Sequence, residues 1–163
     1  MNDFSASLLR GRLVFGKYPT QDEVNTIIKE KFTHVINLCT SDEITWELPL
    51  YNSSIIFYDY PFKDGTSQTP EQGWNSFETF INKVISFLDD PKNKIYIHCL
   101  GGHGRSATIA AIIYGRILNK TSDECLEDVY DAHQLRITMK DKWRKLGAPQ
   151  RAKQKAIVKK YIL

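Results

Sequence analysis

The chain has 163 residues and a formal net charge of +3, with 42% hydrophobic and 25% charged residues, enough for one domain with a sizeable core. This composition argues against a disordered chain, a collagen-like repeat or a disulfide scaffold, and no apolar run reaches the ~18 residues of a membrane span. We therefore expect a single domain over residues 1–163 and, because no secretion signal begins the sequence, a cytoplasmic protein.

The predicted elements of the first half begin with a short apolar strand at residues 13–15. A helix follows, because Thr20 and Glu23 have the spacing of a capping box. Two more strands are predicted at 34–38 and 54–58, which are rich in β-branched and aromatic residues.

A loop containing Pro and Gly leads from the third strand to a longer helix. Its predicted N-cap is Thr69, with Gln72 three residues later, and Pro91 ends it. The apolar residues at helical spacing in this segment are Trp74, Phe77, Ile81, Val84 and Leu88.

The second half begins with a predicted strand at 94–98, then a loop with three glycines and a helix at 106–118. Because that helix is apolar on nearly every side, we expect it to be buried. A second capping box, Thr121 with Glu124, predicts a helix that ends near His133. Its inward face is predicted to hold Leu126, Val129 and Tyr130.

The last predicted helix runs from Pro149 to Leu163, since Pro suits the first turn of a helix. It belongs to a basic segment, residues 134–163, in which ten Lys and Arg accompany one acidic residue. Such a segment can bind nucleic acid or an anionic membrane, but its basic residues fall away from the predicted buried face, as on a solvated helix.

The order of these elements predicts the fold class. Strands alternate with helices, and several helices then follow in succession. This pattern indicates an α/β fold with a central, mostly parallel sheet flanked by helices.

The turn between the predicted strand at 94–98 and the next helix carries the densest chemistry. It reads His98-Cys99-Leu100-Gly101-Gly102-His103-Gly104-Arg105-Ser106. A strand that turns through small residues into a helix presents backbone N–H groups and the positive end of the helix dipole, which form an anion site. The glycines let the backbone curl around a ligand, and the Arg105 guanidinium can hold two phosphate oxygens. We therefore predict that residues 100–105 bind phosphate.

The same field acts on Cys99. The N–H groups, the helix N-terminus and Arg105 all stabilise a thiolate, so we expect a pKa below the ordinary value and an ionised thiol at neutral pH. A thiolate beneath a phosphate cradle predicts transfer of a phosphoryl group to Cys99, followed by hydrolysis. His98 is expected to orient the loop by hydrogen bonding, and Ser106 to donate its hydroxyl to Cys99 and help the sulfur leave.

The pattern H-C-x5-R-S between a strand and a helix resembles the signature of the cysteine-dependent protein tyrosine phosphatase superfamily. Low-molecular-weight tyrosine phosphatases and arsenate reductases carry their thiol loop near the N-terminus, and rhodanese-type sulfurtransferases space it differently. The resemblance therefore implies a compact dual-specificity phosphatase with a phosphatase-type thiol loop, no metal and no cofactor.

The chemistry also needs a proton donor for the leaving oxygen. Among the upstream acids, Asp59 ends a strand and Asp89 and Asp90 end a helix, whereas Asp64 lies in a loop that reads Tyr60-Pro61-Phe62-Lys63-Asp64-Gly65. This string is similar to the acid loops of the phosphatase and tensin homolog and of the phosphatases of regenerating liver. The match implies that Asp64 is the general acid; an ordinary turn Asp before Gly is the alternative.

Two amides on the last predicted helix, Gln150 and Gln154, share its apolar face and are expected to be buried. The segment resembles the Q-x-x-x-Q loop by which many tyrosine phosphatases position the hydrolytic water. Carried over, Gln150 holds that water and Gln154 assists. Because this spacing is common on helices, a purely structural pair is the alternative.

Cys39 is a candidate redox partner. The segment Ile36-Asn37-Leu38-Cys39 resembles the part of the same two relatives that supplies a cysteine able to bridge to the catalytic thiol. If the strands at 34–38 and 94–98 are neighbours, Cys39 approaches Cys99 and oxidation gives a reversible disulfide. A buried apolar cysteine is the alternative, and Cys125 is expected to be filler in the core or at the surface.

The thiol loop also bears on the substrate. Relatives that act on polyphosphoinositides place extra Lys in this loop, whereas here the variable positions are Leu100 and His103, of which only His103 can be cationic. A phosphorylated protein is therefore the expected partner, with phosphotyrosine first and phosphoserine or phosphothreonine second. An RNA 5′-phosphatase, a phosphoinositide phosphatase and a non-catalytic phosphate-binding module remain alternatives.

Other partners are not expected. The sequence ends without the terminal Cys of a prenylation box, so no membrane anchor is predicted. We also expect a monomer and no stable complex with nucleic acid.

Overall fold

The structure is a computed structural model that describes residues 2–65 and 73–162. Its centre is a five-stranded sheet in the order β1-β2-β5-β3-β4, in which β1 is antiparallel to β2 and the other neighbouring pairs are parallel. The strands are β1 (Ser5–Leu8), β2 (Leu13–Gly16), β3 (His34–Asn37), β4 (Ile56–Asp59) and β5 (Ile95–His98). The predicted α/β fold with a mostly parallel sheet is confirmed.

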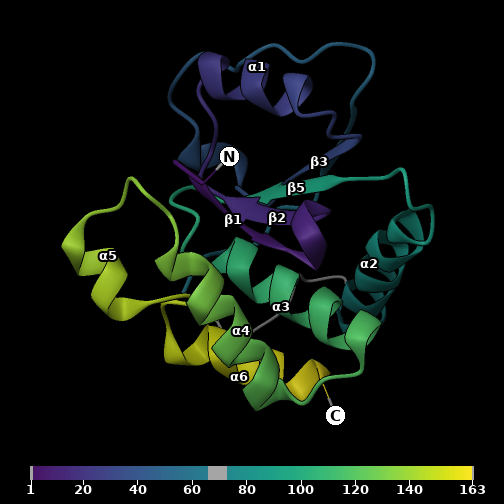
Figure 1. Ribbon diagram of the computed structural model, residues 1–163, viewed down its shortest axis with the longest axis vertical. Helices are drawn as coiled ribbons and strands as arrows, with labels where there is room; N and C mark the ends of the chain where they lie inside the picture. Colours follow the sequence, from purple (N-terminus) through teal and green to yellow (C-terminus); the bar gives the residue numbers. More distant parts are fainter. Residues whose placement is uncertain (1, 66–72, 163) are drawn as a thin grey trace.

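The helices lie in two layers on either side of this sheet. In the described residues they are α1 (Gln21–Lys29), α2 (Gly73–Leu88), α3 (Arg105–Leu118), α4 (Ser122–Gln134), α5 (Asp141–Leu146) and α6 (Ala152–Tyr161), with short 3-10 turns η1 (Leu9–Gly11) and η2 (Ser41–Glu43). One face of the sheet is covered by α1, and the other by α2, α3, α4 and α6 (Figure 1). Helix α3 is central, because it contacts β2 as well as α2, α4 and α6.

The strands explain why the core has two layers. Successive side chains of a strand point to opposite faces of the sheet. In β2, Leu13 and Phe15 therefore join the cluster under α3, while Val14 joins the cluster under α1. In β5, Ile97 and Tyr96 divide in the same way. Strands covered on both faces are buried along their whole length, as β2, β3 and β5 are.

Local sequence signals placed several helices correctly. At the start of α1, the Thr20 side chain accepts a hydrogen bond from Glu23 N, and the Glu23 carboxylate accepts one from Thr20 N. The same reciprocal pair joins Thr121 and Glu124 at the start of α4. Helix α3 is buried at every position from Arg105 to Ile113, as its apolar pattern predicts.

Three features of the structure differ from what the sequence predicts. Strand β1 and helix α5 were not predicted. Tyr130 was predicted to point inward, which is wrong: it is 44% exposed, and its ring lies over Gly147, at the end of α5. The predicted cap residues Thr69 and Gln72 and the side chain of Trp74 lie outside the described residues.

The start of the last helix also differs. It begins at Ala152 instead of Pro149, because Gln154 Oε1 accepts a hydrogen bond from Arg151 N at 3.2 Å and thereby closes the first turn. Gln150 consequently precedes the helix and does not share a helical face with Gln154, so that part of the prediction is wrong.

The parallel strands position the site. In β2, β5 and β3 the C-terminal ends meet at one edge of the sheet, where Gly16, His98 and Asn37 lie in register. In open α/β sheets this edge is where ligands bind. None of the helices in the described residues combines the length and apolar character that a membrane crossing needs.

Candidate active site

The loop between β5 and α3 is arranged as a cradle for an anion. Four of its carbonyl groups accept hydrogen bonds from donors outside the loop: Leu100 from Tyr18 N, Gly101 from Arg136 Nη1, His103 from Gln150 N, and Gly104 from Thr108 N and Oγ1. By contrast, within the described part of the chain the N–H groups of residues 100–104 donate to no acceptor. Free N–H groups at the N-terminus of α3 form an anion site.

Glycine is required at one point of this loop. Gly102 has φ +80°, a conformation that other residues rarely adopt, and a Cβ there would collide with the backbone of Gly16 and Lys17. Gly102 therefore lets the loop pack directly against the end of β2.

Cys99 lies at the floor of the cradle and is 3% exposed. Its Sγ is 3.3 Å from Ser106 Oγ, on the first turn of α3, so the serine hydroxyl is within hydrogen-bonding distance of the sulfur. Ser106 Oγ is also 3.5 Å from the carbonyl of Gly16. The serine hydroxyl is thus held between the sulfur and the end of β2.

Arg105 is held by a carboxylate that the sequence analysis did not identify. Its Nη1 and Nη2 donate to Glu43 Oε2 and Oε1 at 2.8 and 2.6 Å, and Nη1 also donates to the Phe62 carbonyl at 3.0 Å. Burial alone would lower the pKa of Arg105, but the Glu43 hydrogen bonds and the nearby Cys99 and Glu43 charges raise it. Burial would likewise raise the pKa of Glu43, and hydrogen bonds from Arg105 and Thr40 lower it. Arg105 is therefore a fixed cation.

The Glu43 pair leaves one side of the Arg105 guanidinium available. Nη2 donates to Glu43 alone, and Nε is buried without a hydrogen-bond partner among the described residues. A guanidinium has five N–H donors, and its Nε and Nη2 form a second planar fork beside the one that holds Glu43. This second fork is the part of Arg105 that suits a phosphate.

Asp64 lies at the rim of the same pocket, after β4. Its Oδ1 accepts hydrogen bonds from Gln154 Nε2 at 2.8 Å and from Gly65 N at 2.9 Å, and its Oδ2 is 3.6 Å from Arg151 Nη2. Gln154 is 1% exposed and packs against Gly104. A single amide thus links the acid loop to the thiol loop.

Gln150 also lies in the pocket lining, although it is not on α6. Its backbone N–H is bound to the His103 carbonyl at 2.9 Å. Its side-chain Oε1 is buried and has no partner within the described part of the chain. A buried acceptor without a partner suits a water molecule or a ligand.

The two histidines of the thiol loop are neutral. Burial lowers the pKa of His98 and of His103 to about 3. The prediction that His103 can be cationic is therefore wrong: its Nδ1 is 2.8 Å from His133 Nε2, and its ring stacks on Trp143. The His98 ring is buried against Tyr18, with its Nδ1 3.4 Å from the Cys99 carbonyl.

Cys39 lies beside the site, because β3 and β5 are neighbours and Asn37 pairs with His98. All three cysteines are free thiols in this structure. The pKa of Cys39 is raised to about 12: burial is the largest cause, Arg105 opposes it, and the nearby Cys99 and Glu43 add to it. Cys125 was expected in the core or at the surface; it is fully buried in the main core.

The cradle opens into a pocket of about 210 Å³. Its lining comprises Asp64, Cys99, Leu100, Gly101, His103, Gly104, Arg105, Trp143, Gln150 and Arg151. The other predicted site residues, His98, Gly102, Ser106 and Gln154, lie behind this lining. Within residues 2–65 and 73–162, no three or more His, Cys, Asp or Glu side chains gather as a metal-binding group.

Sequence reasoning missed Glu43, Arg136 and Trp143. Glu43 lies three residues after Thr40, which is again the spacing of a capping box, and the carboxylate accepts from Thr40 N and Oγ1. Arg136, which supports the Gly101 carbonyl, is buried within the basic segment. No motif marks Arg136 or Trp143 in the sequence.

Comparisons with known proteins agree with this geometry. The family model described as dual specificity phosphatase, catalytic domain, matches residues 13–151. A protein of Invertebrate iridescent virus 3 that bears the name tyrosine phosphatase 067L is 30% identical over 154 residues, which cover 93% of this chain and 62% of the viral protein. Protein tyrosine phosphatase type IVA 3 of Bos taurus is 28% identical over 106 residues, 62% of this chain and 58% of the bovine protein. The chain thus spans less than two thirds of these relatives.

Solved structures show the same fold. Tk-PTP in its active form is 21% identical, with a TM-score of 0.73 over 96% of this chain and 95% of that one. Kinase associated phosphatase, with its catalytic cysteine replaced by serine, is 20% identical, with a TM-score of 0.74 over 97% of this chain and 92% of that one.

Proposed function

We propose that this chain, which belongs to the family of dual specificity phosphatase catalytic domains, hydrolyses phosphate monoesters of phosphoproteins through a cysteinyl-phosphate intermediate. The observation that carries the proposal is the loop around Cys99. Four of its carbonyl groups are bound by outside donors, whereas among the described residues the N–H groups of residues 100–104 and Arg105 Nε meet no acceptor. Such an array stabilises the negative charge that is spread over the equatorial oxygens of the phosphoryl group during transfer.

In the first step, the Cys99 thiolate attacks phosphorus, so a phosphorus–sulfur bond forms as the bond to the leaving oxygen breaks. The N–H groups of the cradle and Arg105 bind the three equatorial oxygens of the phosphoryl group. Asp64, at the pocket rim, donates a proton to the leaving oxygen, which departs as a neutral alcohol or phenol. The Glu43 carboxylate keeps Arg105 charged and oriented throughout.

In the second step, water attacks phosphorus and the sulfur leaves as a thiolate. The unpartnered Oε1 of Gln150 accepts a hydrogen bond from this water, and Asp64, now ionised, takes its proton. Ser106 donates its hydroxyl to the departing sulfur from 3.3 Å. Gln154 assists indirectly, because it holds the Asp64 carboxylate at 2.8 Å.

The walls of the pocket favour phosphotyrosine among phosphoprotein substrates. Leu100 and Trp143 supply apolar surface on the way to Cys99, and an aromatic ring can pack against both. The loop itself supplies Arg105 as its cation, since His103 is neutral, which disfavours polyphosphorylated lipids. The basic side chains of α6 do not line the catalytic pocket, so they provide no RNA-binding wall beside Cys99.

We further propose a monomer that acts on phosphorylated proteins in the cytoplasm. Three free cysteines, one of them a nucleophile, suit a compartment that keeps thiols reduced. Each of the three is buried in the described structure.

The test is release of phosphate from an aryl phosphate. We expect wild-type protein to turn over, and Cys99→Ser to lose turnover because a serine hydroxyl is not ionised at neutral pH. Cys125→Ala is the matched control, since Cys125 lies in the core at α4, and it should retain activity. Equal rates for wild type and Cys99→Ser would contradict the mechanism, and phosphate binding without turnover would favour a phosphate-binding module.

A further inference from the structure

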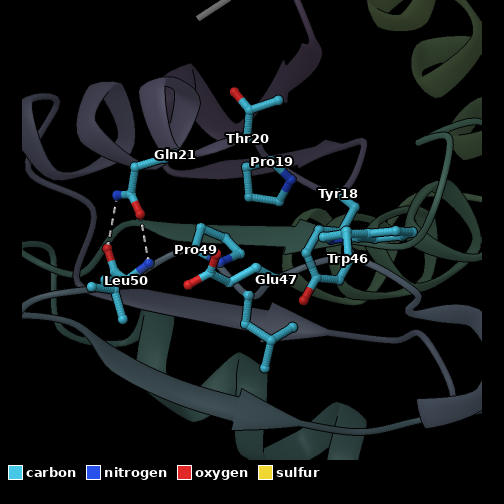
Figure 2. A pocket seen from close by; sticks show the side chains of 9 residues that line it. Tyr18, Pro19, Thr20, Gln21, Trp46, Glu47, Pro49 and Leu50 are labelled. Atoms are coloured by element: carbon cyan, nitrogen blue, oxygen red, sulfur yellow. Dashed lines mark hydrogen bonds between the residues drawn. The ribbon is translucent and has the colours of Figure 1, made fainter.

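A second concave surface lies beside the catalytic pocket. It is a groove of about 410 Å³ between the loop that joins β2 to α1 and the loop that joins β3 to β4. We call it the Tyr18–Trp46 groove; it is lined by Tyr18, Pro19, Thr20, Gln21, Trp46, Glu47, Leu48, Pro49 and Leu50 (Figure 2). None of these residues takes part in the mechanism proposed above.

The lining of the Tyr18–Trp46 groove is mostly apolar and aromatic. The Tyr18 and Trp46 rings meet edge to face, with centroids 5.1 Å apart. Trp46, Leu48 and Leu50 are all large apolar side chains exposed to solvent. Surfaces of aromatic and proline side chains bind apolar side chains of extended peptides, whose backbone stays at the surface.

The groove is held in shape before any ligand binds. The Gln21 side-chain amide pairs with the main chain of Leu50: Leu50 N donates to Gln21 Oε1 at 2.7 Å, and Gln21 Nε2 donates to Leu50 O at 3.1 Å (Figure 2). This pair fixes one loop to the start of α1. A preformed groove binds a peptide with a smaller loss of entropy than a mobile loop.

The groove adjoins the thiol loop that lines the catalytic pocket. Tyr18 N donates to the Leu100 carbonyl at 3.0 Å, so one wall of the groove is bound to the thiol loop. Leu100 itself lines the catalytic pocket and is 46% exposed, which places apolar surface between the two hollows. An extended peptide advances about 3.3–3.6 Å per residue, so residues near a phosphotyrosine in the pocket can reach the groove.

We propose that the Tyr18–Trp46 groove binds an apolar side chain of the substrate polypeptide close to the phosphorylated residue and so selects among phosphoproteins. The proposal rests on the phosphatase function proposed above. Glu47 is the charged side chain of the lining, so an acidic residue at the same substrate position is disfavoured. The same charge opposes an anionic lipid surface as the occupant.

The experiment is a positional scan with phosphotyrosine peptides. One Leu is moved through the four positions on each side of the phosphotyrosine in an otherwise Ser and Gly peptide, and kcat/KM is measured by phosphate release. We expect one position at which Leu raises kcat/KM roughly 10-fold over Ser, because the side chain is removed from water there. Asp at that position should lower kcat/KM below the Ser value.

Variants of groove residues then test whether the Tyr18–Trp46 groove causes the preference for Leu. Trp46→Ala should reduce the ratio of kcat/KM for the Leu and Ser peptides to below about 3-fold, because a large part of the apolar wall is lost. Glu47→Lys should raise kcat/KM for the Asp peptide relative to the Ser peptide. Leu118→Ala is the matched control, since Leu118 is also an exposed apolar residue but lies at the end of α3, and it should keep the wild-type ratios.

The outcomes separate the two proposals. Turnover with equal kcat/KM for every Leu position, or a Leu preference that Trp46→Ala leaves unchanged, would overturn the groove while the phosphatase function stands. Absence of turnover with every phosphotyrosine peptide and with aryl phosphate would overturn the phosphatase function, and the groove proposal with it.

Discussion

Arg105 carries a charge that burial opposes, and Glu43 is the residue that holds it in place. We predict that Glu43→Gln lowers kcat/KM for an aryl phosphate by about 10- to 100-fold, because a buried cation loses its paired charge and the guanidinium its orientation. The measurement is steady-state phosphate release. Asp42→Asn, one residue earlier and exposed, is the control that should retain the wild-type rate; an unchanged rate for Glu43→Gln would contradict the role.

Cys39 makes a second prediction at the residue scale. We expect mild peroxide to convert Cys99 to a sulfenic acid, which the Cys39 thiolate attacks to form a disulfide and release hydroxide. Because burial raises the pKa of Cys39 to about 12, its thiolate fraction grows about tenfold per pH unit, so disulfide formation from the sulfenic acid should accelerate between pH 7 and 9. Mass mapping of thiols over time tests this, and failure to find a link between Cys39 and Cys99 at either pH would refute it.

At the scale of elements, α6 supports the acid loop from behind. Gln154 on this helix donates to Asp64 and packs on Gly104, so it fixes the proton donor relative to the cradle. We predict that Gln154→Ala lowers kcat for phenyl phosphate by about 10-fold and affects a nitrophenyl phosphate less, because a good leaving group depends less on its proton donor. Lys155→Ala, exposed on the same helix, is the control. Equal losses for the two substrates would count against a link through Asp64.

The same elements show what the sequence could predict. Reciprocal caps such as Thr20 with Glu23 and the uniformly apolar α3 are local patterns, and the structure follows them. The thiol loop is local too, so its residues were identified together. Glu43 and Arg105 are 62 positions apart in the sequence and meet only when the chain folds. The role of Glu43 could therefore not be predicted from a local pattern.

Short elements were missed for a related reason. Strand β1 has four residues, and it exists because it pairs with β2 after a turn in which Leu9 and Arg10 have positive φ. Helix α5 has six residues and is held by Arg144, whose guanidinium donates to the carbonyls of Gln134, the last residue of α4, and of Arg136. Elements of this length depend on tertiary contacts more than on propensity.

At the scale of the whole molecule, the interior histidines couple stability to pH. Burial lowers the pKa of His98 and His103 to about 3 and that of His133 to about 4. In the unfolded chain each would titrate near 6.5. Because the folded pKa is the lower one, the unfolded state takes up protons first as pH falls. The contribution of these histidines to stability is therefore fully present above about pH 7 and is lost progressively from about pH 6.5 down to the folded pKa values.

We predict that the free energy of unfolding decreases by about 1 kcal/mol for each of these three histidines, roughly 3 kcal/mol in all, when the pH is lowered from 7 to 5.5. Most carboxylates stay ionised over this interval, so the histidines dominate the change. In His133→Asn the unfolded state binds one proton fewer, and the decrease should be smaller by about 1 kcal/mol, whatever the variant's stability at pH 7. Urea unfolding at both pH values measures this, with Leu118→Ala as a control that keeps the full decrease. If His133→Asn shows the same pH dependence as the wild type, the prediction is contradicted. Protonation of residue 133 in the unfolded chain would then not cause the decrease in the free energy of unfolding.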